Sequence, residues 1–366
     1  MIKKTAKKLL KPFGIHNRED MDYKMKQLLG KSYYWTTYPM AVQIDTTNRC
    51  GPKHSGIICE YCFPQNEVLC GRDHHADMPM DWIEWIQKDM AKNMPRLLDA
   101  SWPPKQQVCY FLNGDWQNEM RSEEILANHA KLLPWLPSQV FTCATKPEEA
   151  KRFVHPYLTW VCVTLSAPNA EIYKKVYHAD KFDNVLKSMR YIDDHSYPHQ
   201  KLEVHYVITQ NNITGMKEWF DLIHKEFPRW RKIFSPLVKS ESNEPSVKAM
   251  GNLTLEQQEQ AIRNVNKYQG FWDHRTTPFH QPCVLWNNAA ITVHGDILQC
   301  CNWSEPKLWN YGNIQDYIAE GRSLKNYWME RLANKQRNSL CRQCNLKHPE
   351  SKRRLEAIDF KVNLKI

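Results

Sequence analysis

The thiols of this chain are its most informative chemical groups, because most of them fall into two clusters. The sequence holds twelve cysteines, and two pairs have the spacing CxxC, Cys59 with Cys62 and Cys341 with Cys344. Thiolates bind soft metals, so this spacing indicates either a zinc site or an iron–sulfur cluster. The early cluster comprises Cys50, Cys59, Cys62 and Cys70, and the late cluster Cys283, Cys300, Cys301, Cys341 and Cys344.

The early cluster offers three closely spaced thiols, those of Cys50, Cys59 and Cys62. A structural zinc ion takes four ligands, so Cys70 or one of two following histidines would have to complete a zinc site. Three thiols alone leave one metal position open, which suits a cluster that binds a substrate directly. The remaining cysteines lie in apolar runs and are expected to pack as small hydrophobic side chains; they are Cys109, Cys143 and Cys162.

Composition places the chain among soluble globular proteins. It has 366 residues, of which 25% are charged and 42% hydrophobic, and a chain of this length can bury a large core. No apolar run approaches the ~18–20 residues that a membrane helix needs. We therefore expect a cytoplasmic protein with reduced thiols and no membrane partner. The net charge of +10 permits an acidic or nucleic-acid partner but does not require one.

Apolar, β-branched segments alternate with helical patterns over the first two thirds of the chain. Such repeated units imply a parallel sheet or barrel, whose reactive groups gather at the carboxyl ends of the strands. The early cysteines follow the first strand and are expected at that edge. Strands are expected at Met40–Asp45, Gln107–Asn113, Ser138–Thr145, Leu158–Ser166, Lys201–Thr209 and Arg231–Val238, and helices at Met80–Met94, Ser122–Leu133, Phe182–Ile192 and Gly215–Phe227.

Two local features refine this pattern. Asp81 and Glu84 are placed to form a capping box at the start of the first long helix. From about Lys239 the alternation lapses into a polar linker, which a further helix follows at Leu255–Tyr268. The residues after it read as a β-hairpin that turns at His294–Gly295 and would bring the flanking thiols together.

The early thiols resemble the cluster loop of the radical S-adenosylmethionine (radical SAM) family. In that family three cysteines follow the first barrel strand, and an aromatic residue precedes the third, as Tyr61 does here. The resemblance implies that Cys50, Cys59 and Cys62 hold a [4Fe–4S] cluster whose fourth iron binds S-adenosylmethionine (SAM). Eight residues separate the first two cysteines here, where the family usually has three, so the triplet Cys59, Cys62 and Cys70 remains an alternative.

Further strand ends resemble the family's cofactor contacts. The segment LNGDW, residues 112–116, stands where the family carries a turn that receives the amino group of SAM. Its glycine would let the backbone approach closely, although an Asn-Gly turn with an exposed aspartate is the alternative. The ends of the fourth and fifth strands imply contacts to the carboxylate or ribose of SAM, again with ordinary turn residues as the alternative. The implied contact residues are Asn113, Gly114, Asp115, Ser166, Thr209 and Asn211.

The late cysteines resemble the SPASM and twitch domains that follow some radical SAM cores. Eleven residues separate Cys283 from Gly295, and four more lead to Cys300, which matches the opening CX9–15GX4C pattern. The segment YGNI resembles the approach to the following helix. The resemblance implies one auxiliary [4Fe–4S] cluster held by Cys283, Cys300, Cys341 and Cys344. Cys301 is an alternative to Cys300, and four thiolates would suit zinc equally.

The resemblance also implies an architecture. We expect an α/β fold with a partial (β/α)6 TIM-like barrel and a small C-terminal domain of twitch type, made of a β-hairpin and a helix. The expected parts are a helical extension at 1–37, the radical SAM core at 38–238, a linker and helix at 239–280, the iron–sulfur domain at 281–350 and a tail at 351–366.

The implied reaction is the reductive cleavage of SAM to a 5′-deoxyadenosyl radical, which removes a hydrogen atom from a substrate. We expect a peptide or protein substrate, and an electron donor such as a flavodoxin or ferredoxin. A radical SAM enzyme that modifies nucleotides or nucleic acids is the alternative, and a zinc protein that binds nucleic acid without catalysis is the alternative from another class. No catalytic acid or base is assigned; Glu119, Glu203 and His205 are expected to be packing or surface residues.

Overall fold

The computed structural model describes the part of the chain that forms the sheet and most of its helices. The described residues are 38–61, 76–96, 106–111, 114–236, 256–257, 260–261, 263–264, 271–272, 288–298 and 310–333. The N-terminal extension, Cys62, Asn113 and all five late cysteines lie outside them, as does most of the linker and the following helix. The domain boundaries therefore stay a prediction.

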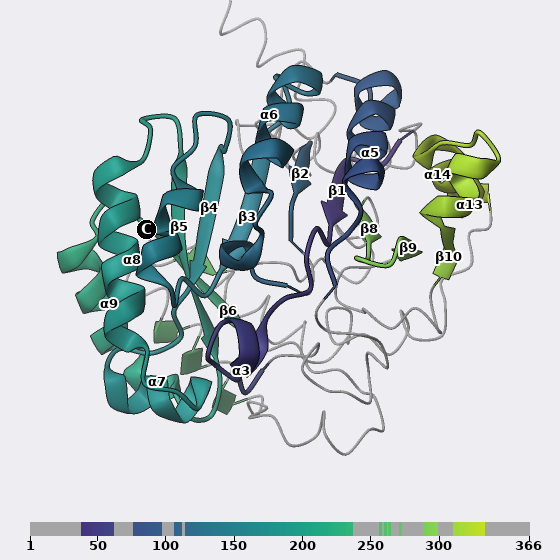
Figure 1. The fold of residues 1–366 in the computed structure, drawn as a ribbon. Helices are drawn as coiled ribbons and strands as arrows, with labels where there is room; N and C mark the ends of the chain where they lie inside the picture. Colours follow the sequence, from purple (N-terminus) through teal and green to yellow (C-terminus); the bar gives the residue numbers. More distant parts are fainter. Residues whose placement is uncertain are drawn as a thin grey trace, which may run out of the picture.

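A single ten-stranded sheet organises the described residues (Figure 1). Its order is β10-β9-β8-β1-β2-β3-β4-β5-β6-β7, and every neighbouring pair from β8 to β7 is parallel. Within the described part of the chain the two end strands do not pair with each other, so the sheet is open. The strands are β1 Ala41–Ile44, β2 Gln107–Cys109, β3 Ser138–Thr142, β4 Trp160–Thr164, β5 Lys201–Ile208, β6 Arg231–Pro236, β7 Phe271–Trp272, β8 Asn288–Ile291, β9 Asp296–Leu298 and β10 Asn310–Asn313.

Helices connect the parallel strands in the order that the sequence predicts. In Figure 1, α7, α8 and α9 lie together on one side of the sheet, and α13 and α14 lie beyond its opposite end. The α/β class and the partial barrel are confirmed. The helices are α3 Gly51–His54, α5 Met80–Asn93, α6 Ser122–Leu132, α7 Ala170–Tyr177, α8 Phe182–His195, α9 Met216–Glu226, α13 Ile314–Ala319 and α14 Leu324–Ala333, with 3-10 turns at η3 Trp116–Asn118, η4 Pro147–Phe153 and η5 Ile213–Gly215.

The two faces of the sheet differ in chemistry. Side chains alternate along a strand, so residues paired in register point to the same face. Val140 and Val161 are paired on one face and fully buried with the helices' apolar side chains. On the other face Cys162 is paired with Glu203, beside Gln139. The central strands therefore bury an apolar layer on one side and a polar layer on the other.

The C-terminal strands extend the same sheet. β8 pairs in parallel with β1, and β9 folds back on β8 in antiparallel register. The turn between them carries Gly295 with a φ of +84°, which confirms the predicted hairpin at His294–Gly295. The YGNI segment forms β10 and the start of α13, and the Asn313 amide donates to the carbonyl of His294 at 2.8 Å. This C-terminal unit thus packs on the edge of the barrel sheet.

A buried carboxylate joins the C-terminal helices to the first long helix. Asp89 on α5 accepts from the Tyr38 hydroxyl at 2.9 Å and from the backbone N–H of Leu324 at 3.0 Å. The second bond satisfies a free N–H at the start of α14, where a negative charge also meets the positive end of the helix dipole. The predicted capping box at Asp81 and Glu84 is wrong, because Pro79 is the N-cap and Glu84 pairs with Lys88.

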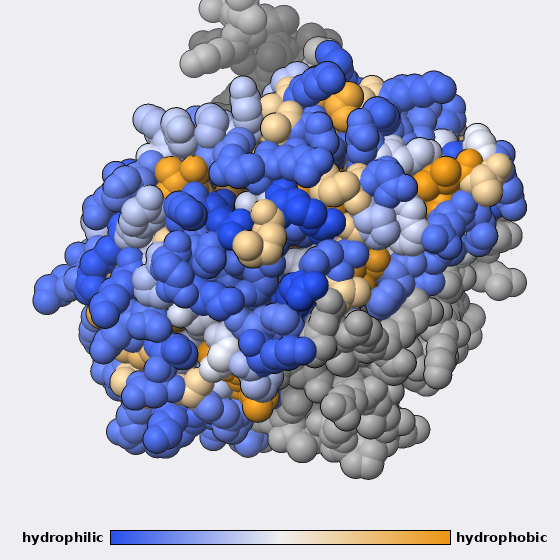
Figure 2. Space-filling model, viewed as in Figure 1, coloured by the Kyte–Doolittle hydropathy of each residue, from blue (hydrophilic) through white to orange (hydrophobic). Residues whose placement is uncertain are grey.

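None of the helices among the described residues is long and apolar enough to cross a membrane. The face in Figure 2 is mainly hydrophilic, with small separate apolar areas. Exposed large hydrophobic side chains are scattered over several elements, as is ordinary for a protein surface; they are Ile58, Met120, Tyr157, Tyr191, Tyr197, Ile318 and Met329.

Gly295 is expected to be the least replaceable glycine of the C-terminal unit. A Cβ there would lie 2.7 Å from Ile314 Cγ2 and 2.8 Å from Asn313 Oδ1, in addition to the strain of a positive φ. We expect Gly295→Ala to lower the free energy of unfolding by about 2–4 kcal/mol. Gly321→Ala is the matched control, because its φ is +63° but no atom lies within 4 Å of the added Cβ. Gly321→Ala should lower the free energy of unfolding by about 1 kcal/mol. Urea unfolding followed by circular dichroism measures both variants. Equal losses of stability in the two variants would contradict the packing argument.

Candidate functional site

The early cysteine loop begins where β1 ends and folds into a compact turn. Cys50 is the N-cap of α3, the single helical turn that lies within the eight intervening residues. Gly51 and Gly56 have φ angles of +74° and +69°, and the N–H groups of Ser55 and Gly56 both donate to the carbonyl of Gly51. Since a helix advances little per residue, the long insertion lets Cys50 and Cys59 stay close.

The Cys59 segment runs along the end of α7. The N–H of Ile58 donates to the carbonyl of Tyr177, and that of Glu60 donates to the carbonyl of Val176, both at 2.9 Å. These bonds hold the backbone on both sides of Cys59, whose side chain is 5% exposed. The loop is therefore fixed to the fourth strand–helix unit as well as to β1.

The Cys143 thiol, at the carboxyl edge of the sheet, contacts Cys59 and lies within electrostatic reach of Cys50. A hydrogen bond to Cys59 and burial raise the pKa of the Cys143 thiol. Burial, Cys143 and Asp115 raise the pKa of Cys50. Both of these thiols are thus kept protonated until a cation compensates their charge, because thiolates and a carboxylate at close range repel one another. Sequence reasoning placed Cys143 among the packing cysteines and missed this contact; its position just after β3 was the available signal.

The buried carboxylate of Asp115 accepts hydrogen bonds from several groups near these thiols. It accepts from the Gln117 amide at 2.7 Å, from the backbone N–H of Cys143 at 3.2 Å and from the Ser55 hydroxyl at 3.3 Å. Ser55 in turn lies 3.9 Å from the Cys50 sulfur. Burial raises the pKa of Asp115, and these donors oppose that shift. With an exposed fraction of 2%, Asp115 contradicts the interpretation of this segment as a turn with an exposed aspartate.

Gly114 brings the second strand's loop against the cysteine loop. A Cβ at this position would lie 1.8 Å from the carbonyl oxygen of Thr47, a separation that no side chain tolerates. The glycine thus lets two backbone segments of the protein meet, and the expected approach to the amino group of SAM stays a prediction. The Gly114 N–H donates to Asp45, the residue that follows β1, at 3.3 Å.

The side chains of Tyr61 and Ser166 lie together, although the sequence analysis predicted no contact between them, and their roles toward SAM stay predictions. The Tyr61 hydroxyl lies 3.2 Å from Ser166 Oγ and donates to the Tyr177 hydroxyl at 2.8 Å. The Ser166 N–H donates to the same Tyr177 oxygen at 2.8 Å. These bonds tie the aromatic residue of the cysteine loop to the end of β4.

The residues that follow β5 lie at the same edge of the sheet. The Thr209 side chain is fully buried, and its hydroxyl has no hydrogen-bond partner among the described residues. The Asn211 amide donates to Glu60, the residue beside Cys59, at 2.6 Å. Sequence reasoning missed Asn212, whose amide donates to the carbonyls of Ser166 at 2.9 Å and Val207 at 2.8 Å and so joins the ends of β4 and β5.

Glu119 is a structural residue. Its fully buried carboxylate pairs with Arg121 at 2.8 Å, and the same guanidinium donates to the carbonyl of Thr46 at 3.0 Å. Glu203 and His205 instead face the polar layer of the sheet, where they contact each other. Cys62, Cys70 and Asn113 lie outside the described residues, as do Cys283, Cys300, Cys301, Cys341 and Cys344, so both ligand sets stay predictions.

Two solved structures share this architecture. The crystal structure of Streptococcus suis SuiB bound to S-adenosylmethionine aligns with a TM-score of 0.61 at 14% identity, over 94% of this chain and 81% of that chain. Histidine-tagged anSMEcpe with bound AdoMet aligns with a TM-score of 0.57 at 14% identity, over 85% of this chain and 82% of that chain. The chain has the fold of these two proteins. The fold implied by the cysteine loop is confirmed, although the sequence itself matches no protein-family model and no curated protein.

Replacing Asp115 tests whether its carboxylate orders the cysteine loop. Asp115→Asn turns one acceptor oxygen into a donor that faces other donors, so we expect a loss of about 1–3 kcal/mol in the free energy of unfolding and reduced iron uptake. Asp77→Asn is the matched control, because Asp77 binds Arg49 of the same loop at 2.9 Å in a part-exposed ion pair. Such pairs contribute about 0–1 kcal/mol. Urea unfolding and iron analysis measure both variants. Similar effects of the two changes would show that the Asp115 carboxylate does not order the cysteine loop.

Cys143 and Cys59 are in contact, so substituting each of them separately tests which one binds iron. If Cys50, Cys59 and Cys62 are the ligands, Cys143→Ser should retain most of the iron bound after anaerobic reconstitution, whereas Cys59→Ala should lose nearly all of it. Iron and sulfide analysis with the visible spectrum measures both variants. Loss of the cluster in Cys143→Ser would instead make Cys143 a ligand.

Proposed function

We propose that this chain is a radical SAM enzyme. The observation that carries the proposal is the position of Cys50 and Cys59 in one loop directly after β1, at the carboxyl edge of an open parallel sheet, where both interact with the Cys143 thiol. The two SAM-bound structures with the same fold support it. Three cysteines that leave one iron unligated would account for a cluster loop at this edge.

The described residues fit this cofactor pair. Cys50 and Cys59 supply soft thiol donors that are not disulfide-bonded, and Cys62 would be the third ligand. The buried Thr209 hydroxyl at the same edge needs a hydrogen-bond partner, which a ribose or carboxylate of SAM would provide. When bound, the cluster and SAM supply a 5′-deoxyadenosyl radical that removes a hydrogen atom from an unactivated C–H bond.

The protein's own side chains hold the cysteine loop in position and would shield the cofactors from solvent. The Asp115 network fixes the loop that bears Cys50, and the Tyr61, Tyr177 and Ser166 hydroxyls hold the far end of the loop against β4. Gly114 keeps the second strand end in contact with the loop. Asn211 and Asn212 hold the end of β5 at the same edge. If these strand ends contact SAM as we propose, their positions would be fixed before SAM binds.

We further propose an auxiliary [4Fe–4S] cluster held by Cys283, Cys300 or Cys301, Cys341 and Cys344. The hairpin turn at Gly295, which belongs to the CX9–15GX4C pattern, supports this part of the proposal. Four thiolate ligands would leave no iron open, so the cluster would serve electron transfer or structure. Zinc in place of iron at this site is the outcome that metal analysis would detect.

The substrate that we propose is a peptide or protein, modified in the cytoplasm with a flavodoxin or ferredoxin as electron donor. The open sheet supports this choice, because the described strands do not close into a barrel and an unclosed barrel would admit a long substrate at its edge. A nucleic-acid substrate is the alternative that the net charge of +10 permits.

The proposal predicts SAM cleavage by the reconstituted protein. Anaerobic protein with iron, sulfide, dithionite and SAM should form 5′-deoxyadenosine, measured by liquid chromatography and mass spectrometry. Cys59→Ala should reduce the rate at least a hundredfold, whereas Cys109→Ser, a buried cysteine of β2, should retain it. A wild-type protein that binds zinc, stays colourless and forms no 5′-deoxyadenosine would refute the proposal.

The same assay tests the substrate class. An extract from cells grown in D2O should transfer deuterium to 5′-deoxyadenosine, because the hydrogen atom comes from the substrate. Protease treatment of the extract should abolish the transfer if the substrate is a protein or peptide. Loss of transfer after nuclease treatment, with no effect of protease, would establish the nucleic-acid alternative instead.

A further inference from the structure

A second group of metal-ligating side chains lies on the polar face of the sheet, away from the cysteine loop. Cys162 is the middle residue of β4, and Glu203 and His205 belong to β5. Cys162 is paired with Glu203, and Thr164 with His205, so the three side chains share one face. All three are buried, and their sulfur, oxygen and nitrogen atoms lie within 4.8 Å of one another.

Two of the three separations between these atoms are close to the edges of a tetrahedral metal site, and the third is under 4.8 Å. Glu203 Oε2 lies 3.7 Å from Cys162 Sγ and 3.2 Å from His205 Nε2. Zinc bonds to sulfur at about 2.3 Å and to nitrogen or oxygen at about 2.0–2.2 Å, so tetrahedral ligands stand about 3.3–3.6 Å apart. The group therefore needs little rearrangement to hold an ion at its centre.

Neighbouring side chains orient two of the three groups. The Gln139 amide donates to Cys162 Sγ at 3.2 Å, and Arg231 donates to Glu203 Oε1 at 3.1 Å. Because Arg231 binds the first carboxylate oxygen, the second oxygen is the one that faces Cys162 and His205. The ring of Phe141 packs edge-on against His205, with centroids 5.4 Å apart. Such outer contacts are typical of metal sites.

We propose that Cys162, Glu203 and His205 bind one divalent metal ion of borderline softness, with zinc as the ion that this mixed sulfur, nitrogen and oxygen set favours. Three protein ligands leave the fourth position to water or a small ligand, as in catalytic rather than structural zinc sites. Burial and Glu203 raise the pKa of the Cys162 thiol, and a bound dication would displace its proton. The site shares no residue with either cysteine cluster and does not rest on the proposed SAM chemistry.

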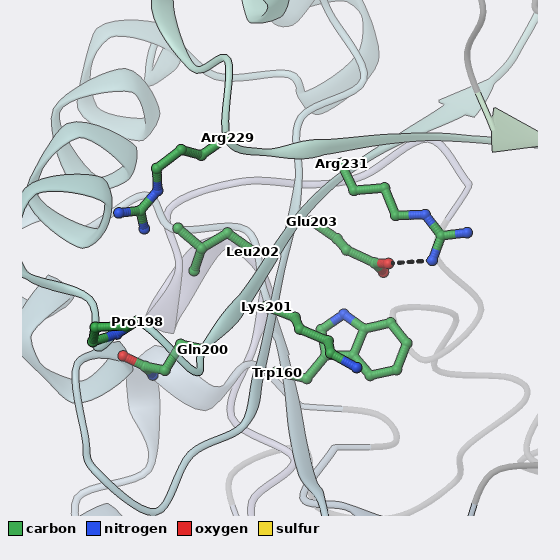
Figure 3. Close-up of a pocket in the computed structure, with 8 residues that line it drawn as sticks. All are labelled: Trp160, Pro198, Gln200, Lys201, Leu202, Glu203, Arg229 and Arg231. Carbon is green, nitrogen blue, oxygen red and sulfur yellow. Dashed lines mark hydrogen bonds and ion pairs between the residues drawn. The ribbon is translucent and has the colours of Figure 1, made fainter. Parts of the chain in front are cut away.

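A pocket lies beside this group and is lined in part by Glu203. It has a volume of about 480 Å³ and opens at the amino ends of β4, β5 and β6 (Figure 3). In Figure 3 Glu203 points toward Arg231, with the indole of Trp160 beside them. Of the three residues of the ligand group, only Glu203 lines the pocket. The pocket therefore reaches the edge of the group from the end of the sheet opposite the cysteine loop.

The test compares zinc content between matched variants of the full chain. After anaerobic reconstitution of the clusters, incubation with Zn²⁺ and gel filtration, wild-type protein should hold one zinc equivalent more than Cys162→Ala or His205→Gln, with equal iron. The zinc X-ray absorption difference between wild type and variant should correspond to one sulfur and otherwise nitrogen or oxygen ligands. Cys109→Ser removes a buried thiol from β2 and should leave the zinc content unchanged.

Equal zinc in wild type and both variants would overturn the proposal, as would an equal loss in Cys109→Ser. If Cys162→Ala and His205→Gln also lose iron, these changes have disturbed the fold. Glu203→Gln then decides whether the site binds zinc, because it keeps the shape of the side chain. Loss of one zinc equivalent in Glu203→Gln at normal iron content would support the site, and retention would refute it.

Discussion

The buried carboxylate of Asp115 is the contact on which the candidate site depends. It lies where three segments meet: the turn after Cys50, the 3-10 turn η3 and the end of β3. Each of these segments would otherwise bury polar groups without partners, which costs more than the bonds themselves contribute. One acceptor group therefore makes the positions of Cys50 and Cys143 depend on each other, although they stand 93 positions apart in the sequence.

This constraint explains how an unusually long cysteine spacing is compatible with one metal cluster. An extended eight-residue segment would carry Cys59 far from Cys50, since each residue adds up to ~3.3 Å. The α3 turn shortens the path, and Ser55 at its end returns to the Asp115 network. The second half of the segment then pairs with the end of α7. The insertion is thus folded against the site and supplies part of its support.

The sequence predicted the fold well because the signals for strands and helices are local. The six barrel strands and the four helices predicted between them appear within a few residues of their expected ends. The roles of Asp115, Cys143 and Asn212 escaped prediction, because each depends on contacts between strand ends that are far apart in the sequence. The capping box failed for a local reason: Pro79 occupies the N-cap, so Asp81 and Glu84 stand too late in the helix.

The polar layer of the sheet follows a different physical rule from the cysteine edge. At the edge, the side chains come from loops, so a shared acceptor, the Asp115 carboxylate, is needed to hold them. In the layer, strand pairing alone brings Cys162 against Glu203, because neighbouring residues in register share a face about 5 Å apart. A ligand group built this way sits on rigid backbone and needs only its outer contacts, Gln139 and Arg231, for orientation. The apolar helix-covered face explains why these polar side chains converge, since the other face of each strand is the one place left for them.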